Sequence, residues 1–190
     1  MKIIKTPIPD LLIVEPDVFN DQRGYFFEVY NQERYFNNNM NMQFVQDNES
    51  KSGKNVLRGL HFQKPPFAQG KLVRVIQGKV LDVAVDIRKG SPTYGKHVAV
   101  ELTEDNHIQF FIHKGFAHGF AVLSETAVFQ YKCDNFYHPE ADGGISILDD
   151  TLGIDWKIPT EHANLSEKDT KHAMLKNFDT PFDISVDLYI

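Results

Sequence analysis

Alternation of apolar and polar residues between about residue 56 and residue 133 is the feature that most constrains the fold. In residues 79–88, Leu81, Val83 and Val85 share one parity, while Asp82 and Asp86 share the other. The same alternation recurs in residues 97–102 and 127–133. A period of two predicts antiparallel strands that each bury one face. Glycine and proline turns at roughly ten-residue spacing favour a sandwich or barrel built from these strands.

Helical signals are few and lie near the two ends of the chain. Residues 31–36 are compatible with one or two turns. The best candidate is 166–177, where Ser166 would be the N-cap residue and Asp169 follows three positions later, as in a capping box. The sequence therefore predicts an all-β core, strands near the N-terminus and a helical C-terminal tail.

Length, charge and cysteine content exclude several classes of protein. A chain of 190 residues is expected to form one domain, spanning residues 1–190. A net charge of −6 argues against binding of nucleic acid by bulk charge. A single cysteine, Cys133, excludes an intramolecular disulfide and a cysteine-based zinc cluster. No signal peptide and no apolar run of about 20 residues is present, so we expect a cytoplasmic protein with no membrane partner.

The segment VLRGLHFQ at residues 56–63 carries an arginine, a glycine and a histidine within an apolar strand. Strict alternation places Arg58 and His61 on opposite faces of that strand. If both serve one pocket, the strand must bulge, and Gly59 is the position where a bulge could form. The alternative is an edge arginine and a hydrogen-bonded core histidine.

Three further side chains could take part in acid–base chemistry. Lys71, at the start of an apolar strand, could stabilise an oxyanion if it points inward, or could end the strand in solvent. Tyr131 could act as a general acid or be a satisfied core tyrosine. Asp169 could orient a histidine and fix its tautomer, or could only cap the tail helix.

Histidines also raise the possibility of a metal site. His113 and His118 lie five residues apart around two glycines, and imidazole binds zinc, iron and nickel well. A third and fourth ligand would have to come from elsewhere, for instance His61 or His107, and no nearby glutamate completes the set. A metal-dependent oxygenase or isomerase using His61, His113 and His118 is therefore the weaker alternative.

Several ordered motifs together resemble the dTDP-4-dehydrorhamnose 3,5-epimerases, which are RmlC-like members of the cupin superfamily. The resemblance extends from about residue 3 to residue 178. The motifs are 21–28 (DQRGYFFE), 46–50 (QDNES), 57–63 (LRGLHFQ), 70–73 (GKLV), 115–120 (GFAHGF), the tyrosines at 131 and 137, and 165–169 (LSEKD).

This resemblance implies a cupin jelly roll, a homodimer and no metal or other cofactor. The substrate it implies is dTDP-4-dehydro-6-deoxyglucose, with both C3 and C5 inverted on the way to dTDP-L-rhamnose. By resemblance His61 is the base, paired with Asp169, Tyr131 is the acid, and Lys71 stabilises the enolate oxygen. The residues implied in substrate binding are Arg23, Phe26, Glu28, Gln46, Asn48, Arg58, His118, Tyr137, Asp142 and Lys168. The resemblance also implies that Tyr137 stacks on thymine and that the N-terminal residues reach across the dimer.

Position 142 departs from the family pattern, because Asp142 stands where the family usually has glutamate. Two alternatives to the double epimerase are compatible with the motifs: an epimerase that inverts a single carbon of a nucleotide 4-ketosugar, and a non-catalytic nucleotide-sugar binder. The chemistry itself fits the residue types, since a C4 ketone acidifies the hydrogens on C3 and C5, and inversion needs a base and an acid on opposite faces of the sugar.

Overall fold

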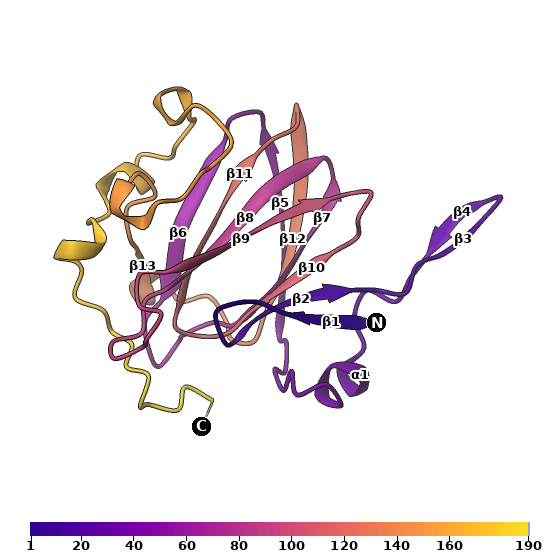
Figure 1. Ribbon diagram of the computed structural model, residues 1–190, viewed down its shortest axis with the longest axis horizontal. Coiled ribbons are helices and arrows are strands. Elements are labelled where there is room, and N and C mark those ends of the chain that lie inside the picture. The colour runs from indigo at the N-terminus through magenta and orange to yellow at the C-terminus, as the bar shows by residue number, and fades with distance from the viewer. Residues whose placement is uncertain (190) are drawn as a thin grey trace.

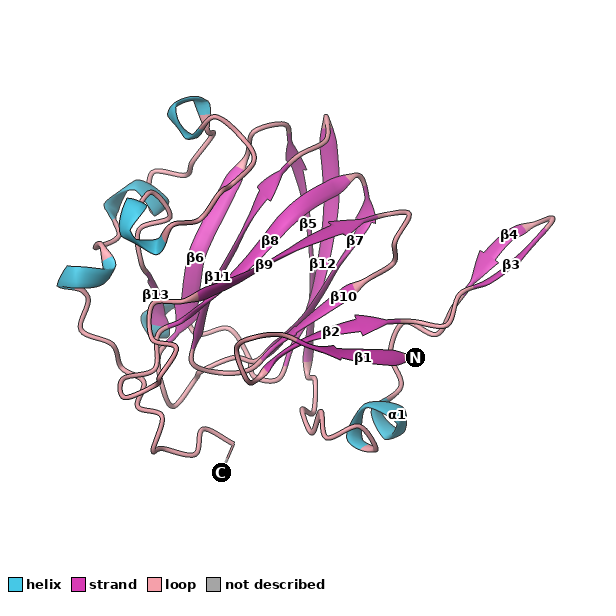
Figure 2. Ribbon diagram, viewed as in Figure 1, coloured by secondary structure: helices cyan, strands magenta, loops and turns pink. Residues whose placement is uncertain are grey.

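Two antiparallel sheets packed face to face form the body of the protein in a computed structural model, which describes residues 1–189 (Figure 1; Figure 2). The first sheet has six strands in the order β1 (Lys2–Lys5), β2 (Leu11–Glu15), β10 (Gln109–Ile112), β7 (Lys71–Gln77), β12 (Thr126–Cys133) and β5 (Gln46–Gly53). The second has five, in the order β13 (Asp142–Gly144), β6 (Leu57–Gln63), β11 (Phe116–Val122), β8 (Lys79–Asp86) and β9 (His97–Thr103). The predicted mainly β architecture is confirmed.

The remaining elements are short. A separate hairpin pairs β3 (Phe19–Asp21) with β4 (Gly24–Phe26) and projects away from the sandwich (Figure 1). The helix α1 (Gln32–Phe36) begins after Asn31, whose side chain accepts a hydrogen bond from the Arg34 amide, so the predicted turns at 31–36 are confirmed. In the described residues five 3₁₀ turns follow β12: η1 (Pro139–Ala141), η2 (Asp150–Leu152), η3 (Thr160–His162), η4 (Asp169–Lys171) and η5 (Leu175–Asn177). Within residues 1–189, no helix is long and apolar enough to cross a membrane.

Strand β8 is buried on both faces, which corrects the prediction that it buries only one. Val80 and Ala84 belong to the core between the sheets. Leu81 and Val83 belong to a second core on the outer face of the five-stranded sheet. Residues from 145 onward cover that outer face and contribute Ile145, Ile147, Leu152, Trp156 and Phe182 to the second core. The face of β8 that carries Asp82 therefore points into the sandwich. The face that carries Leu81 and Val83 packs under the C-terminal segment.

The predicted continuous helix over 166–177 is wrong. The Ser166 hydroxyl does cap the first turn by accepting a hydrogen bond from the Asp169 amide at 3.2 Å, but the helical backbone ends at Lys171. Beyond it the chain bonds to the protein body, because the Ser146 amide donates to the Ala173 carbonyl at 2.8 Å and the Leu175 amide donates to Asp149 at 2.6 Å. These tertiary hydrogen bonds replace the ones a longer helix would make.

Candidate active site

A cleft enters the sandwich between the two sheets and has two adjoining lobes. The inner lobe has a volume of about 390 Å³ and the outer lobe about 440 Å³. Four side chains line both lobes, so the lobes form one continuous site. These are His61, Lys71, Tyr131 and Lys168.

A bulge in β6 brings Arg58 and His61 to the same side of the strand. On the neighbouring strand β11, Phe120 pairs with Arg58 and His118 pairs with His61, so three steps along β6 match two along β11. The bulge lies at Gly59, whose φ of +131° disfavours other residues. A Cβ at Gly59 would lie 2.6 Å from the Gly119 Cα, so the close approach of the two strands also requires glycine. The predicted bulge is confirmed, and both polar side chains line the inner lobe.

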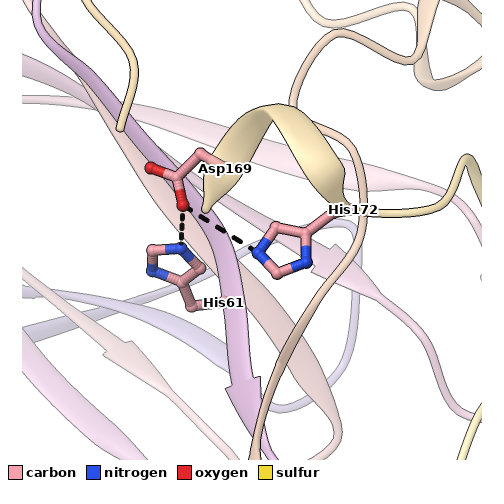
Figure 3. A group of neighbouring side chains, drawn as sticks. All are labelled: His61, Asp169 and His172. Carbon is pink, nitrogen blue, oxygen red and sulfur yellow. Dashed lines mark hydrogen bonds and ion pairs between the residues drawn. The ribbon is translucent and has the colours of Figure 1, made fainter. Parts of the chain in front are cut away.

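His61 and Asp169 form a close pair, with 2.6 Å between the imidazole Nε2 and the carboxylate Oδ1 (Figure 3). Burial opposes the charged form of Asp169, yet the hydrogen bond with His61 holds the pKa of that carboxyl below its ordinary value. An ionised carboxylate only accepts hydrogen bonds, so Nε2 of His61 must donate. The pair therefore fixes the neutral tautomer in which the other ring nitrogen, Nδ1, is unprotonated and can act as a base.

Lys71 and Tyr131 face His61 from the opposite sheet. They lie on the neighbouring strands β7 and β12, with the Lys71 ammonium 5.8 Å from the centre of the Tyr131 ring. Burial lowers the pKa of Lys71 and raises the pKa of Tyr131, so the phenol holds its proton at neutral pH. Within the described part of the chain no ion pair engages Lys71, so its amine is available to a ligand in the cleft.

Cys133 lies next to Lys71 and Tyr131, but its thiol is a poor nucleophile. It pairs across the strands with Lys71 and is fully buried. Burial raises the pKa of its thiol to about 11, so the nucleophilic thiolate is scarce at neutral pH.

Most of the residues predicted to bind substrate line the cleft, and three do not. Arg58 and His118 line the inner lobe, and the outer lobe is lined by Gln46, Asn48, Tyr137 and Asp142. Lys168 forms an ion pair with Asp142 in the outer lobe.

Arg23, Phe26 and Glu28 lie on or just after the projecting hairpin and do not line the cleft of their own chain. Arg23 pairs with Asp21 and Glu28 pairs with Arg34, while the Phe26 ring is 70% exposed. In the single chain their side chains are therefore occupied locally or left in solvent.

Two residues near the site were not predicted. Asp82 is fully buried and accepts hydrogen bonds from His118 Nε2 at 2.9 and 3.0 Å. Asp82 lies among the polar residues of the alternating pattern in β8, and that pattern predicts burial of one face of the strand only. His172 lies on the other side of Asp169, with 3.9 Å between Nε2 and Oδ1. Burial, and then the neighbouring His61, lower the pKa of His172.

The histidine set considered for a metal is only partly brought together, because His113 lies apart from the cross-strand neighbours His61 and His118. The His113 ring bonds to the Tyr189 hydroxyl at 2.9 Å, and His118 is held by Asp82. In residues 1–189, the group with metal-ligand spacing is a different one, His61, Asp169 and His172.

The fold and the cleft together define an acid–base enzyme built on a jelly-roll sandwich. The model of the dTDP-4-dehydrorhamnose 3,5-epimerase family matches residues 5–177. The epimerase of Salmonella typhimurium is 53% identical over 176 residues, which cover 92% of this chain and 96% of that protein. The chain belongs to the dTDP-4-dehydrorhamnose 3,5-epimerase family of isomerases, as its motifs predicted.

Solved structures agree with this assignment. A dTDP-6-deoxy-D-glucose-3,5-epimerase from Legionella pneumophila, in complex with dTDP-4-keto-L-rhamnose, superposes with a TM-score of 0.90 at 50% identity, covering 94% of each chain. A 3′-monoepimerase from Streptomyces bikiniensis, in complex with dTDP-quinovose, has a TM-score of 0.83 at 29% identity, covering 90% of this chain and 86% of that one. The jelly-roll prediction is confirmed, and the same fold carries both kinds of epimerase.

Proposed function

We propose that this chain epimerises dTDP-4-dehydro-6-deoxyglucose at C3 and C5, with His61 as the base and Tyr131 as the acid. The observation that carries the proposal is their placement on opposed sheets. His61 enters the cleft from the five-stranded sheet, and Tyr131 enters from the six-stranded sheet. A sugar bound between the sheets would meet the base on one face and the acid on the other, which is what inversion of a carbon centre requires.

The proposed cycle moves one proton off the sugar and another onto it. His61 Nδ1 takes the hydrogen on a carbon next to the ketone, and the electron pair of that C–H bond moves onto the ketone oxygen as an enolate. Asp169 stabilises the imidazolium, and the Lys71 ammonium opposes the enolate charge. Tyr131 then gives its phenolic proton to the other face of the carbon. Solvent reprotonates the phenolate and takes the proton from His61, which completes the balance.

Binding of the nucleotide is assigned to the rest of the cleft. Arg58 and Lys168 suit the diphosphate, since a guanidinium and an ammonium provide charge-assisted hydrogen bonds to phosphate oxygens. The exposed ring of Tyr137, in the outer lobe, is placed to stack on thymine.

The hairpin β3–β4 is assigned to a second copy of the chain. It projects from the sandwich (Figure 1). It leaves Phe19, Tyr25 and Phe26 65%, 59% and 70% exposed, so it offers an apolar surface to a partner. In a homodimer, Arg23, Phe26 and Glu28 would reach the partner's cleft and complete its substrate contacts.

Proton NMR of the substrate in D₂O with catalytic amounts of protein tests the reaction directly. Enzyme-dependent deuterium at both C3 and C5, with the L-lyxo product, is the expected result. Label at one carbon alone would make the chain a single-site epimerase, the alternative supported by its likeness to the monoepimerase fold. Absence of label at either carbon, with folded protein, would overturn the proposal.

A further inference from the structure

Three potential metal ligands, the pair His61–Asp169 and the neighbouring His172, meet where β6 approaches the turn η4. His61 comes from β6, Asp169 begins η4, and His172 directly follows it, so the carboxylate lies between the two imidazoles (Figure 3). One nitrogen or oxygen atom from each residue lies within 4.8 Å of the others. The two rings are edge to face, with 5.7 Å between their centres.

One ring nitrogen of His172 is left without a hydrogen bond. Among residues 1–189, its buried Nε2 atom has no hydrogen-bond partner, which is costly for a polar nitrogen. The ring lies over Gly144, where an added Cβ would come within 2.6 Å of Nε2. Gly144 is itself the strand partner of His61. The glycine therefore leaves room for a buried ring nitrogen near His61, and in the tautomer with its proton on Nδ1 this nitrogen can bind a metal ion.

We propose that His61, Asp169 and His172 form an inhibitory site for a divalent transition-metal ion such as Zn²⁺. Two imidazoles and one carboxylate are ligands that zinc accepts, with open positions left for water from the cleft. Ligand atoms around tetrahedral zinc lie about 3.4 Å apart. The contact of Asp169 with His61 would widen from 2.6 Å and its contact with His172 would shorten from 3.9 Å, so both changes are below about 1 Å.

Metal binding and proton abstraction exclude each other at His61. The ion needs the Nε2 lone pair, so the proton on Nε2 moves to Nδ1, the atom that would take the substrate proton. No net proton is released, but the base is lost and Asp169 no longer supports an imidazolium. The inhibition rests on the proposed function of His61, whereas the binding of the ion does not.

The test titrates Zn²⁺ into the full chain, freed of metal with EDTA, in a non-coordinating buffer and followed by calorimetry without substrate. The same protein is then assayed for deuterium exchange at each Zn²⁺ concentration, relative to its own metal-free rate. The variants are His172→Ala and His172→Gln, with His162→Ala as the matched control, because His162 is an exposed histidine on η3. The substrate diphosphate also binds Zn²⁺ and so lowers the free Zn²⁺ concentration in every assay. Comparison with the control variant corrects for this effect.

We expect one Zn²⁺ per chain in the parent and in His162→Ala, with inhibition that EDTA reverses. Both His172 variants should need at least about ten times more Zn²⁺ for binding and for inhibition. Equal binding and inhibition in the parent and a folded His172 variant, or no binding in the parent, would overturn the site. Binding that depends on His172 but leaves the rate unchanged would support the site and instead overturn the base role of His61.

Discussion

Replacing Asp169 with asparagine tests the central pair of the site with the smallest change in shape. The carboxylate is only 3% exposed and lies 2.6 Å from His61 Nε2. An amide keeps the volume but removes the charge that stabilises the imidazolium formed when His61 accepts a proton. We expect the substrate still to bind and the rate of proton abstraction to fall.

The size of the effect follows from that one contact. A hydrogen bond to a charged group contributes about 1.5–3 kcal/mol. If the imidazolium loses this amount in the transition state, the rate falls by about 10-fold to 160-fold, because about 1.36 kcal/mol corresponds to a factor of ten. An asparagine that turns its NH₂ group toward His61 would also enforce the wrong tautomer, and the loss could then reach about 10⁴-fold.

The assay is deuterium exchange at C3 and C5, measured for Asp169→Asn and for the matched control Asp150→Asn, which alters an exposed carboxylate on η2. Circular dichroism establishes that both variants are folded. The reasoning is refuted if folded Asp169→Asn exchanges within about twofold of the parent, since the carboxylate would then contribute less than about 0.4 kcal/mol to the transition state.

Four further outcomes are expected. Tyr131→Phe should keep deuterium exchange by His61 but lower the yield of inverted product by about 10²–10⁴-fold, which NMR of exchange and configuration separates; equal losses of both would contradict the acid role. Lys71→Met should lower the rate by about 10²–10³-fold without lowering the melting temperature, because burial already disfavours the charged amine; a clear loss of thermal stability would argue against this. Gly59→Ala should destabilise the fold by about 1–3 kcal/mol in urea unfolding, because of its positive φ and the Gly119 backbone, and a neutral result would contradict the close strand approach. The pKa of Asp169 is lower in the folded than in the unfolded chain, so its contribution to stability is present above about pH 4 and is lost as the pH falls through the folded pKa. The melting temperature of Asp169→Asn should therefore vary less with pH in that acidic range than that of the parent. Identical pH profiles of the two melting temperatures would refute the linkage.

Local patterns in the sequence predicted the strands well because alternation reports the two faces of a strand directly. They could not predict what covers each face. The alternation predicts one buried face for β8, yet Asp82 on its other face is buried beside His118. The apolar face of β8 is covered by residues from 145 onward, far along the chain. Such burial on both faces depends on tertiary packing, which a short window of sequence does not contain.

In the candidate site, too, local sequence patterns predicted some features, and others depend on tertiary packing. The bulge at Gly59 could be predicted because only a bulge reconciles Arg58 and His61 with one pocket. The end of the tail helix at Lys171 could not, since it depends on hydrogen bonds to Ser146 and Asp149. His172 was also missed, because its place beside Asp169 appears only once that turn has docked.

The segment that begins at residue 145 has two tasks that are usually separate. It seals the outer face of the five-stranded sheet, and it also delivers Asp169 to His61. A molecule in which this segment has not docked has no carboxylate beside His61, so catalytic competence should require the docked segment. Proteolytic cleavage or local unfolding of the segment would then abolish activity while the rest of the sandwich stays folded. Loss of activity would therefore be detected before global unfolding.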